Sequence, residues 1–434
     1  MMSKSPPHYS SASDYKVPLR KVVDFLDRHF AILLILSFAA IHLLYHRVPV
    51  DSRSPSWSGE NYNVATSIVH GKGFADPFAP LETGPSAFVA PPFPYLLAGV
   101  FWLAGTNTPR AARLSIFLQA LIFAGTVCLL YAIVQAVFST FCARLAALIW
   151  LISPNRIGLT STYFLSEVGL STFSLLLAVF ALIRFKETPT RNAATLAGLA
   201  IGFAILCLPV MAVALPLFAH VLYALARRRT SHSLIAPAIA LTLCSAILTP
   251  WMVRNYVVFG TFVFIKSNFS QALYDANRDE KGEGFMLLYT SKADRALMQR
   301  MGEIPYMRFT LQRALAWIRG HKREFLVRCL RRGFMLWVAN PARGLKRWTW
   351  NLYQIPLLLS STLGLWRHWG RSPITKFCFA ILITVPSVYS LTAFADEHRY
   401  RLPLEALLTV FASAALTPSL PGHREPRPTV LASV

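Results

Sequence analysis

Apolar runs alternate with short polar segments along most of the chain. A helix needs about 20 mostly apolar residues to cross the hydrocarbon core of a membrane, and several runs approach this length. The pattern therefore predicts an all-α integral membrane protein with about ten transmembrane helices. The ten runs are residues 30–45, 113–138, 143–158, 163–183, 193–208, 210–226, 234–251, 351–366, 374–394 and 402–417.

One further apolar run, residues 93–105, is too short to cross by itself. Charge indicates where it lies, because short cytoplasmic loops of membrane proteins carry an excess of Lys and Arg. If this run does not cross, the basic segments at 184–191, 227–229 and 367–376 all fall on the side of the basic N-terminus. We therefore expect residues 93–105 to form a helix at the outer membrane interface, directly after the paired prolines of "APPFP".

This topology predicts one membrane domain with two long outer loops. Residues 30–417 form the domain, between a disordered cytoplasmic tail at 1–29 and a cytoplasmic C-terminal tail at 418–434. The segments 46–112 and 252–350 fall outside. Loops of this length are uncommon in compact proteins unless they are functional, so we expect the active groups there.

The second outer loop contains a predicted amphipathic helical region at 305–338. Apolar side chains recur there at helical spacing, and four arginines, Arg323, Arg328, Arg331 and Arg332, lie largely off the stripe. We expect a helix that lies in the membrane interface. Its apolar stripe consists of Phe325, Leu326, Cys329, Leu330, Phe334 and Trp337.

Composition agrees with a membrane protein. The chain of 434 residues is 54% hydrophobic, and only 15% of its residues are charged, against about 25% in soluble domains. Lys and Arg number 43 against 20 Asp and Glu, and the excess lies mostly in connecting segments, where it sets topology and contacts anionic lipid. No basic stripe falls in a soluble nucleic-acid-binding module, so nucleic acid is not an expected partner. The six scattered cysteines indicate neither a disulfide framework nor a metal site.

Candidate catalytic and binding residues gather on the predicted outer side. Ionisable groups in a membrane domain are costly and usually functional, although charges at helix ends are cheap. Each group also has a structural explanation, because an acid suits the first turn of a helix and a Trp–Arg pair suits the membrane interface. The candidates are Glu60 in "GENYNVATSIVHGKGF", Glu167 in "TSTYFLSEVGLSTF", Trp251 and Arg254 in "TPWMVRNYVVFG", and Arg399, Tyr400 and Arg401 in "DEHRYRLP".

The order of these features resembles the polytopic GT-C glycosyltransferases of the protein O-mannosyltransferase and aminoarabinose–lipid A transferase kind, including their relatives that decorate lipopolysaccharide. The resemblance covers roughly residues 30–415 and rests on these stretches together with "APPFPYLLAGVFWLAG", "ARLS" and "ARLAALIWLISP". It implies a GT-C-type bundle with juxtamembrane helices in the first outer loop, an active site at the outer membrane surface and a polyprenyl-phosphate sugar donor. It also implies that Glu60 is the catalytic acid of the first outer loop.

Two positions depart from the aminoarabinose-type pattern. Ser58 and Gly59 stand where those relatives have an Asp-Glu pair, and Ala90 stands where a lysine precedes the paired prolines. The phosphate contact is therefore expected from Arg254, Arg399 or Arg401, and stacking on a sugar ring from Tyr400 or Trp251. Glu167 is the second candidate for the catalytic acid. A divalent cation held by the two acids is an alternative that no ligand spacing supports.

The expected reaction is transfer of a sugar to a lipid, glycan or protein acceptor by direct displacement. A carboxylate deprotonates the acceptor hydroxyl while cations hold the departing polyprenyl phosphate. A transporter or flippase of lipid-linked sugar and a non-catalytic envelope assembly subunit are the alternatives. A transporter would carry charges near the membrane midplane, whereas the ionisable clusters here lie at one surface. The expected location is a bacterial inner membrane, with the active site on the periplasmic face.

Overall fold

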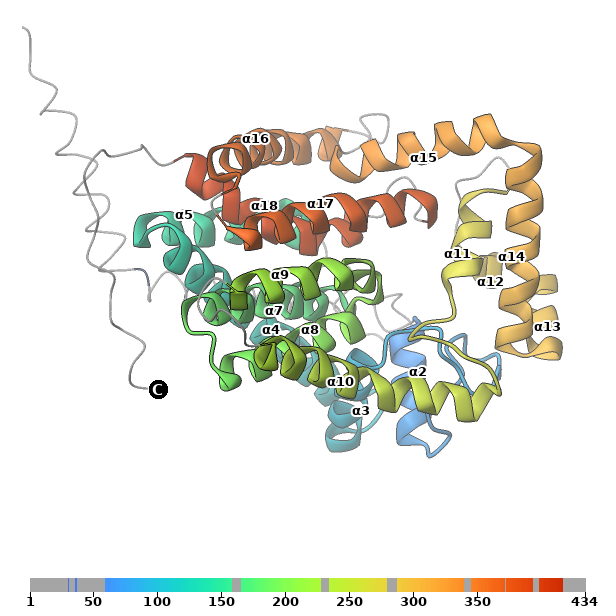
Figure 1. The fold of residues 1–434 in the computed structure, drawn as a ribbon. Helices are drawn as coiled ribbons and strands as arrows, with labels where there is room; N and C mark the ends of the chain where they lie inside the picture. Colours follow the sequence, from blue (N-terminus) through green and yellow to red (C-terminus); the bar gives the residue numbers. More distant parts are fainter. Residues whose placement is uncertain are drawn as a thin grey trace, which may run out of the picture.

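The computed structural model describes residues 59–157, 165–227, 234–278, 287–338, 345–370, 372–392 and 398–416, together with Phe30 and Leu36. Every regular element in these ranges is a helix (Figure 1), which confirms the predicted all-α fold. The two predicted tails, and the predicted run 30–45 apart from those two residues, lie outside the described residues.

Five of the described helices are long and apolar enough to cross a membrane. They account for the predicted runs at 113–138, 163–183, 210–226, 234–251 and 374–394, and the chain is a multi-pass membrane protein. The five are α4 (Pro109–Val137), α7 (Val168–Glu187), the continuous stretch of η2 (Pro209–Ala214) and α9 (Leu215–Arg227), α10 (Ile235–Phe259) and α17 (Pro373–Thr392).

The other predicted runs within the described residues also form helices. These helices are short or partly polar, so the predicted total of ten transmembrane helices stays a prediction. Three apolar helices are shorter than a membrane span: α3 (Pro92–Ala104), α5 (Thr140–Leu151) and α8 (Arg191–Cys207). Helix α16 (Leu345–His368) begins with a polar turn, and α18 (Leu402–Ala415) has only 14 residues, all of them buried.

Close contacts between helix backbones hold the bundle together at glycines. A Cβ atom at Gly198 of α8 would lie 2.3 Å from the carbonyl oxygen of Ala240 in α10. A Cβ atom at Gly364 of α16 would lie 2.0 Å from the carbonyl oxygen of Phe411 in α18. Small residues permit such approaches between membrane helices, so these two positions fix the spacing of α8 against α10 and of α16 against α18.

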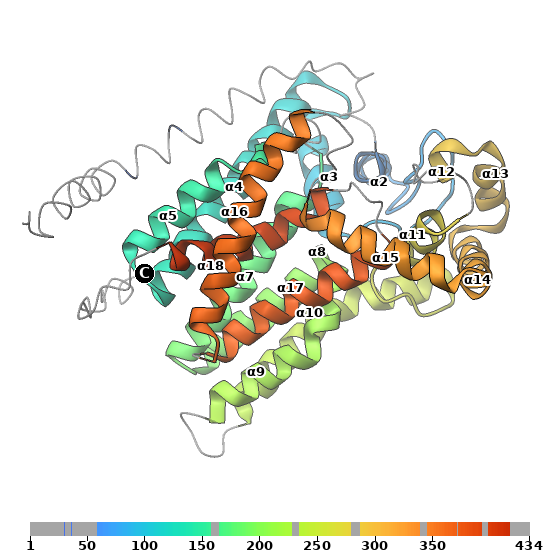
Figure 2. The same cartoon turned by 90° about the horizontal axis from the view of Figure 1, so that it is seen from above.

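The two long segments between membrane helices gather at one end of the bundle, as both views show (Figures 1 and 2). We call this end the loop end. Its first segment carries α2 (Glu60–Val69) and α3. Its second segment carries α11 (Phe269–Ala276), α12 (Leu287–Thr290), α13 (Lys292–Met301), α14 (Glu303–Gly320) and α15 (Lys322–Trp337). The side of the membrane that the loop end faces stays a prediction.

Helices α2 and α3 are the two juxtamembrane helices that the sequence predicts in the first loop. Ala65 of α2 is fully buried in a cluster with Phe93 and Phe101 of α3, and three further residues of α2, Tyr62, Ile68 and Val69, pack against the same cluster. The chain then turns back through Gly71 and Gly73, whose φ angles of 76° and 73° favour glycine.

Helix α15 differs from its predicted orientation. The residues that it buries are Cys329, Arg332 and Leu336, whereas Leu330 and Phe334 of the predicted apolar stripe are 67% and 61% exposed. Hydrogen bonds of Arg332 explain this orientation. Its guanidinium donates to the carbonyl oxygens of Ser390 and Ala276 and to Oδ1 of Asn277, at 2.7–2.9 Å. The face that carries this arginine therefore packs on α17 and α11, and the prediction that placed Arg332 off the buried face was wrong.

Candidate active site

The structure brings the two predicted acids to one place at the loop end. Glu60 is the first residue of α2, and Glu167 directly precedes α7. Asn61, the next residue of α2, donates a hydrogen bond of 2.6 Å from Nδ2 to Oε2 of Glu167. The juxtamembrane helix is thereby attached to the start of a membrane helix, with both carboxylates close to the attachment point.

A lysine that the sequence pattern does not single out faces both carboxylates. Lys266, in the extended segment between α10 and α11, interacts electrostatically with Glu167 and with Glu60. Arg399 is the second cation and interacts with Glu167. Burial acts to raise the pKa of Glu167, but the charges of Lys266 and Arg399 outweigh it and hold that pKa below its usual range. We call these four residues, Glu60, Glu167, Lys266 and Arg399, the charge cluster.

Tyrosines border the charge cluster. Tyr289 of α12 shares a side-chain hydrogen bond with Glu60. Tyr389 and Tyr400 are stacked, with ring centroids 4.7 Å apart and an interplanar angle of 25°. Tyr389 interacts electrostatically with Glu167, and the Arg399 guanidinium lies 5.1 Å from the centre of the Tyr400 ring. The arrangement joins two carboxylates, two cations and an aromatic surface, and it places the predicted residue Tyr400 at the cluster.

Trp251 supports the segment that carries Lys266. Its indole Nε1 donates to the carbonyl oxygen of Ile265 at 2.9 Å, and Asn255 Nδ2 donates to the carbonyl oxygens of Val263 and Ile265 at 3.1 and 3.3 Å. Trp251 is only 8% exposed. One edge of its ring therefore fixes the residue next to Lys266.

The structure does not bring Arg254 to the two acids. Its guanidinium donates to the carbonyl oxygens of Ser86 at 2.7 Å and Phe74 at 3.0 Å, and it lies 4.9 Å from the centre of the Trp251 ring. The carboxylate with which it interacts electrostatically is Glu303. This arrangement favours a role in holding the first loop segment, and the predicted phosphate contact of Arg254 stays a prediction.

Glu303 joins the two loop segments. This carboxylate is 3% exposed and accepts hydrogen bonds from Ser86 Oγ at 2.5 Å, the Ala87 amide at 2.8 Å and Ser267 Oγ at 2.7 Å. The Ser267 amide donates to the carbonyl oxygen of Ala87 at 2.9 Å. Burial raises the pKa of Glu303 despite these hydrogen bonds. We call this set the Glu303 clasp, and it fixes the residue on the other side of Lys266.

Arg401 lies in the core rather than in the charge cluster. It is 1% exposed, and its Nε donates to Oε1 of the fully buried Glu405 at 2.7 Å. Its Nη1 donates to the carbonyl oxygen of Leu336 at 3.2 Å, while Ser153 and Asn155 complete the hydrogen bonding of Glu405. The buried ion pair argues for a structural role, and the interpretation that all clear ionisable groups lie at one surface was wrong for this pair.

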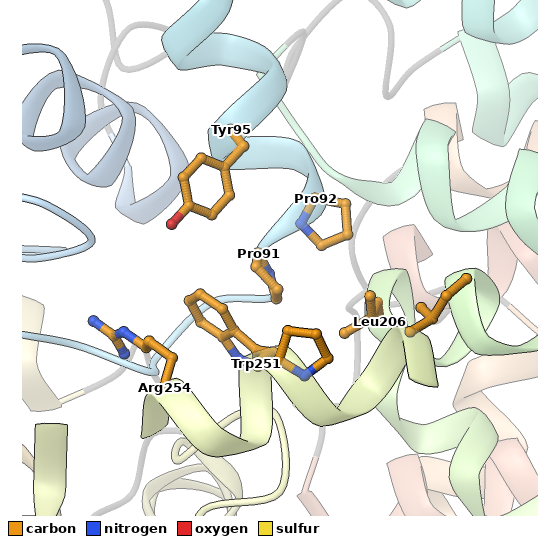
Figure 3. Close-up of a pocket in the computed structure, with 8 residues that line it drawn as sticks. Pro91, Pro92, Tyr95, Leu206, Trp251 and Arg254 are labelled. Atoms are coloured by element: carbon orange, nitrogen blue, oxygen red, sulfur yellow. The ribbon is translucent and has the colours of Figure 1, made fainter. Parts of the chain in front are cut away.

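An apolar groove of about 390 Å³ lies between the start of α3 and α10, next to Trp251 (Figure 3). Arg254 and Tyr95 lie together toward one side of it, and Leu206 lies toward the other. Trp251 forms part of its wall and also donates to the carbonyl oxygen of Ile265, so this indole contacts both the groove and the segment that carries Lys266. The groove is lined by Pro91, Pro92, Tyr95, Leu206, Ile247, Pro250, Trp251 and Arg254.

The residues present do not suit a divalent cation between the two acids. Lys266 and Arg399 already oppose the charge of Glu167, and Lys266 also faces Glu60, so a dication there would meet two positive side chains. In the ranges that the structure describes, no group of three His, Cys, Asp or Glu side chains is arranged to hold a metal ion. We therefore derive no step through a metal.

Residues 89–253 match the family described as dolichyl-phosphate-mannose-protein mannosyltransferase. The matched region runs from the start of α3 to near the end of α10, so it includes Glu167 and Trp251 and ends before Lys266. A search of curated protein sequences found no match.

The fold is similar to that of solved glycosyltransferases. The archaeal oligosaccharyltransferase AglB from Archaeoglobus fulgidus, in complex with an inhibitory peptide and a dolichol-phosphate, is 14% identical with a TM-score of 0.54. Its apo form is 13% identical with a TM-score of 0.53, and each alignment covers 88% of this chain and 50% of that chain. ArnT from Cupriavidus metallidurans bound to undecaprenyl phosphate gives 14% identity and a TM-score of 0.41, over 87% of this chain and 77% of that chain.

This chain spans about half the length of the oligosaccharyltransferase structures that it matches. The helical architecture, the apolar helices and the family match agree with one another and confirm the resemblance drawn from the sequence. The chain is a polytopic membrane protein with the GT-C glycosyltransferase fold.

Proposed function

We propose that the protein is a membrane glycosyltransferase that moves a sugar from a polyprenyl-phosphate donor to a lipid, glycan or protein acceptor. The observation that carries this proposal is the charge cluster at the loop end of an apolar bundle, in which Glu60 and Glu167 face Lys266 and Arg399. Sugar transfer from a lipid phosphate needs a carboxylate for the acceptor and positive charge for the leaving phosphate. The cluster contains both.

Glu60 is assigned the role of general base. The acceptor hydroxyl transfers its proton to this carboxylate as its oxygen bonds to the anomeric carbon. The bond between that carbon and the phosphate oxygen breaks, and the phosphate keeps the electron pair. Tyr289 orients Glu60 through their hydrogen bond. Glu167 is less suited to this role, because its lowered pKa makes it a weak base and its Oε2 already accepts from Asn61.

The groove next to Trp251 suits the hydrocarbon chain of the donor. Its walls are mostly proline and aliphatic side chains, and it lies against the indole that holds the lysine segment. A prenyl chain in the groove would carry its phosphate around Trp251 toward the charge cluster. The stacked Tyr389 and Tyr400 offer an aromatic face on which a sugar ring can lie, next to Arg399.

The family match and one of the similar structures support the donor class. The matching family is named for transfer of mannose from dolichyl phosphate to protein, and the AglB structure contains a dolichol-phosphate. Polyprenyl phosphates are lipids of this kind. For the acceptor, the AglB complex contains a peptide, and here a lipid or glycan is an equal candidate.

The loop end is proposed to face the outside of a bacterial inner membrane. Arg184 and Lys186 lie in the last turn of α7, α8 begins at Arg191, and α9 ends at Arg227, so basic residues flank both of these connections. Both connections lie at the ends of α7 and α9 opposite the charge cluster. Basic connections favour the cytoplasmic side, which leaves the cluster on the other face.

A flippase of lipid-linked sugar is the second candidate, and the buried pair of Arg401 and Glu405 favours it. Ionisable groups inside a membrane domain often mark the path of a transported ion or substrate. Both groups are nevertheless satisfied within the bundle, by each other and by neighbouring side chains and carbonyls. The glycosyltransferase therefore remains the proposal, and release of the lipid phosphate distinguishes the two functions.

The test uses the full-length protein in nanodiscs with a panel of synthetic polyprenyl-phosphate sugars and with envelope glycolipids and glycoproteins from a deletion strain as acceptors. Release of free polyprenyl phosphate and labelled product are measured. The wild type should release the lipid phosphate with at least one sugar of the panel. Movement of intact donor across proteoliposomes, without any release, would instead establish the flippase.

A further inference from the structure

Lys266 occupies an unusual place for a surface lysine. It is half-buried at the loop end, and the residue before it, Ile265, is fully buried. Electrostatically it interacts with Glu167 and Glu60, yet within the described ranges none of the ion pairs closer than 4.0 Å involves Lys266. The two carboxylates have other donors, Asn61 for Glu167 and Tyr289 for Glu60.

The backbone on both sides of Lys266 is fixed. Trp251 and Asn255 hold Ile265 from α10, and the Glu303 clasp holds Ser267 through its hydroxyl and its amide. These bonds connect α10, α14 and the first loop segment to the two residues that flank Lys266. Such support is far more than a solvated loop lysine needs, and it restricts where the ammonium group can lie.

We propose that Lys266 contacts the phosphate of the donor in the charge cluster and holds it as the glycosidic bond breaks. This inference rests on the proposed function. An ammonium group has three hydrogen-bond donors and pairs well with a phosphate oxygen. A phosphate placed between Lys266 and Arg399 brings the leaving group next to both cations.

Two other candidate cations, Arg254 and Arg401, already bind groups within the protein. Arg254 donates to the carbonyl oxygens of Phe74 and Ser86, and Arg401 is buried against Glu405. The position before the paired prolines, Ala90, carries no charge. Lys266 therefore supplies from the second loop segment the ammonium group that the first segment lacks. Burial, and to a smaller extent the charge of Arg399, lowers the pKa of Lys266, while Glu167 and Glu60 act against this shift.

The first test measures binding of undecaprenyl phosphate, without a sugar, to the full-length protein in nanodiscs by native mass spectrometry. Lys266→Gln should weaken binding about ten- to a hundredfold, the range expected for loss of a charge-assisted hydrogen bond. Lys266→Arg keeps the charge and should stay within about fivefold of the wild type. Lys292→Gln is the matched control, because Lys292 is an exposed lysine of the same loop segment and its loss should change binding less than twofold.

A double variant separates phosphate binding from mere charge balance. If Lys266 only neutralises Glu167, then Glu167→Gln combined with Lys266→Gln should restore binding to the wild-type level. If Lys266 contacts the phosphate, the double variant should bind as weakly as Lys266→Gln. Restoration of binding, or a Lys266→Gln protein that binds within twofold of the wild type, would overturn the inference.

Chemical labelling of the wild type tests whether Lys266 contacts the phosphate, even if the Lys266→Gln variant does not fold. Undecaprenyl phosphate should protect Lys266 from acylation by a water-soluble reagent while leaving Lys292 reactive, as quantified by peptide mass spectrometry. Equal labelling of Lys266 with and without the lipid would contradict the proposal. Normal sugar transfer with equal labelling would remove only this inference, whereas absence of lipid binding and of transfer in the wild type would remove the proposed function itself.

Discussion

Asn61 and Glu167, the first a residue of the juxtamembrane helix α2 and the second the residue before the membrane helix α7, are joined by a hydrogen bond of 2.6 Å. The bond fixes the start of α2 to the bundle. Because Glu60 is the neighbour of Asn61, its position depends on this contact, so the geometry of the charge cluster and the docking of α2 are coupled.

Asn61→Ala should reduce stability and activity together. Removing a donor from a partly buried carboxylate costs about 1.5–3 kcal/mol, and Glu60 loses its support. The pKa of Glu167 is lowered in the folded protein, so the stabilisation by its charged form is present near pH 7 and is lost as the pH falls through that pKa. The difference in melting temperature between the variant and the wild type should therefore be largest near pH 7 and shrink in acid. His70→Ala, at the exposed end of α2, is the control, and equal melting temperatures at pH 7 would show that the bond does not anchor α2.

Glu60→Gln should fold, bind undecaprenyl phosphate and lose transfer. Glutamine keeps the shape but cannot take the proton, and the loss of general-base catalysis lowers a rate about 10²–10⁴-fold. Glu82→Gln is the matched control, since Glu82 is a 74% exposed acid of the same loop segment. Transfer by Glu60→Gln within threefold of the wild type would remove the assignment and make Glu167 the next candidate.

Arg399→Gln and Arg401→Gln should differ in kind, although the two arginines stand two residues apart. Arg399 belongs to the charge cluster, so its loss should weaken donor binding and leave the melting temperature nearly unchanged. Arg401 is paired with the buried Glu405, and removal of one partner of a buried ion pair costs about 3–5 kcal/mol of stability. Adding Glu405→Leu to Arg401→Met should recover much of that loss. A stable Arg401→Gln protein with impaired donor binding would reverse the two assignments.

Asp275 should make stability depend on pH. It is 1% exposed in α11, and burial raises its pKa to about 7 despite the nearby positive charge of Arg278. Between the ordinary carboxyl pKa and 7 the folded state holds a proton that the unfolded state has lost, so stability falls as the pH rises through this range. The stability of Asp275→Asn should depend less on pH over the same range, and this variant should be more stable than the wild type at pH 8. Parallel melting curves from pH 5 to 8 would contradict the expectation.

Cysteine labelling on intact cells tests which side the loop end faces. In a cysteine-free background, Lys72→Cys and Lys292→Cys place one exposed thiol in each loop segment, and Glu187→Cys places one at the opposite end of α7. A membrane-impermeant reagent should modify the first two and spare the third. The reverse pattern would place the charge cluster in the cytoplasm and exclude the proposed topology.

Much of the fold could be predicted from the sequence, because apolar length and helical spacing are local properties. The short helix at 92–104 and the amphipathic start at Glu60 both follow from them. Contacts between distant segments were harder to predict. Lys266 is a single lysine in an apolar stretch. Its interaction with Glu60 and Glu167, and the bonds from Trp251 and Glu303 to its two neighbours, appear only in the structure.

The two arginines of "HRYR" carry a local signal that distinguishes them. Glu405 follows Arg401 by four residues, a spacing that pairs opposite charges on one helix face. The same spacing from Arg399 reaches Pro403, which has no charge, so the sequence alone could have separated the two arginines. No comparable local pattern marks Arg332, whose acceptors come from α11 and from near the end of α17.

The Glu303 clasp joins residues that are synthesised at very different times, so it can form only late in synthesis. Ser86 and Ala87 emerge from the ribosome long before Ser267 and Glu303, and α4, α7, α9 and α10 must be inserted in between. Until residue 303 has been added, the first loop segment lacks its buried carboxylate, and Lys266 lacks one of its two supports. A nascent chain therefore carries Glu60 and Glu167 well before the second loop segment and Lys266 can be fixed beside them.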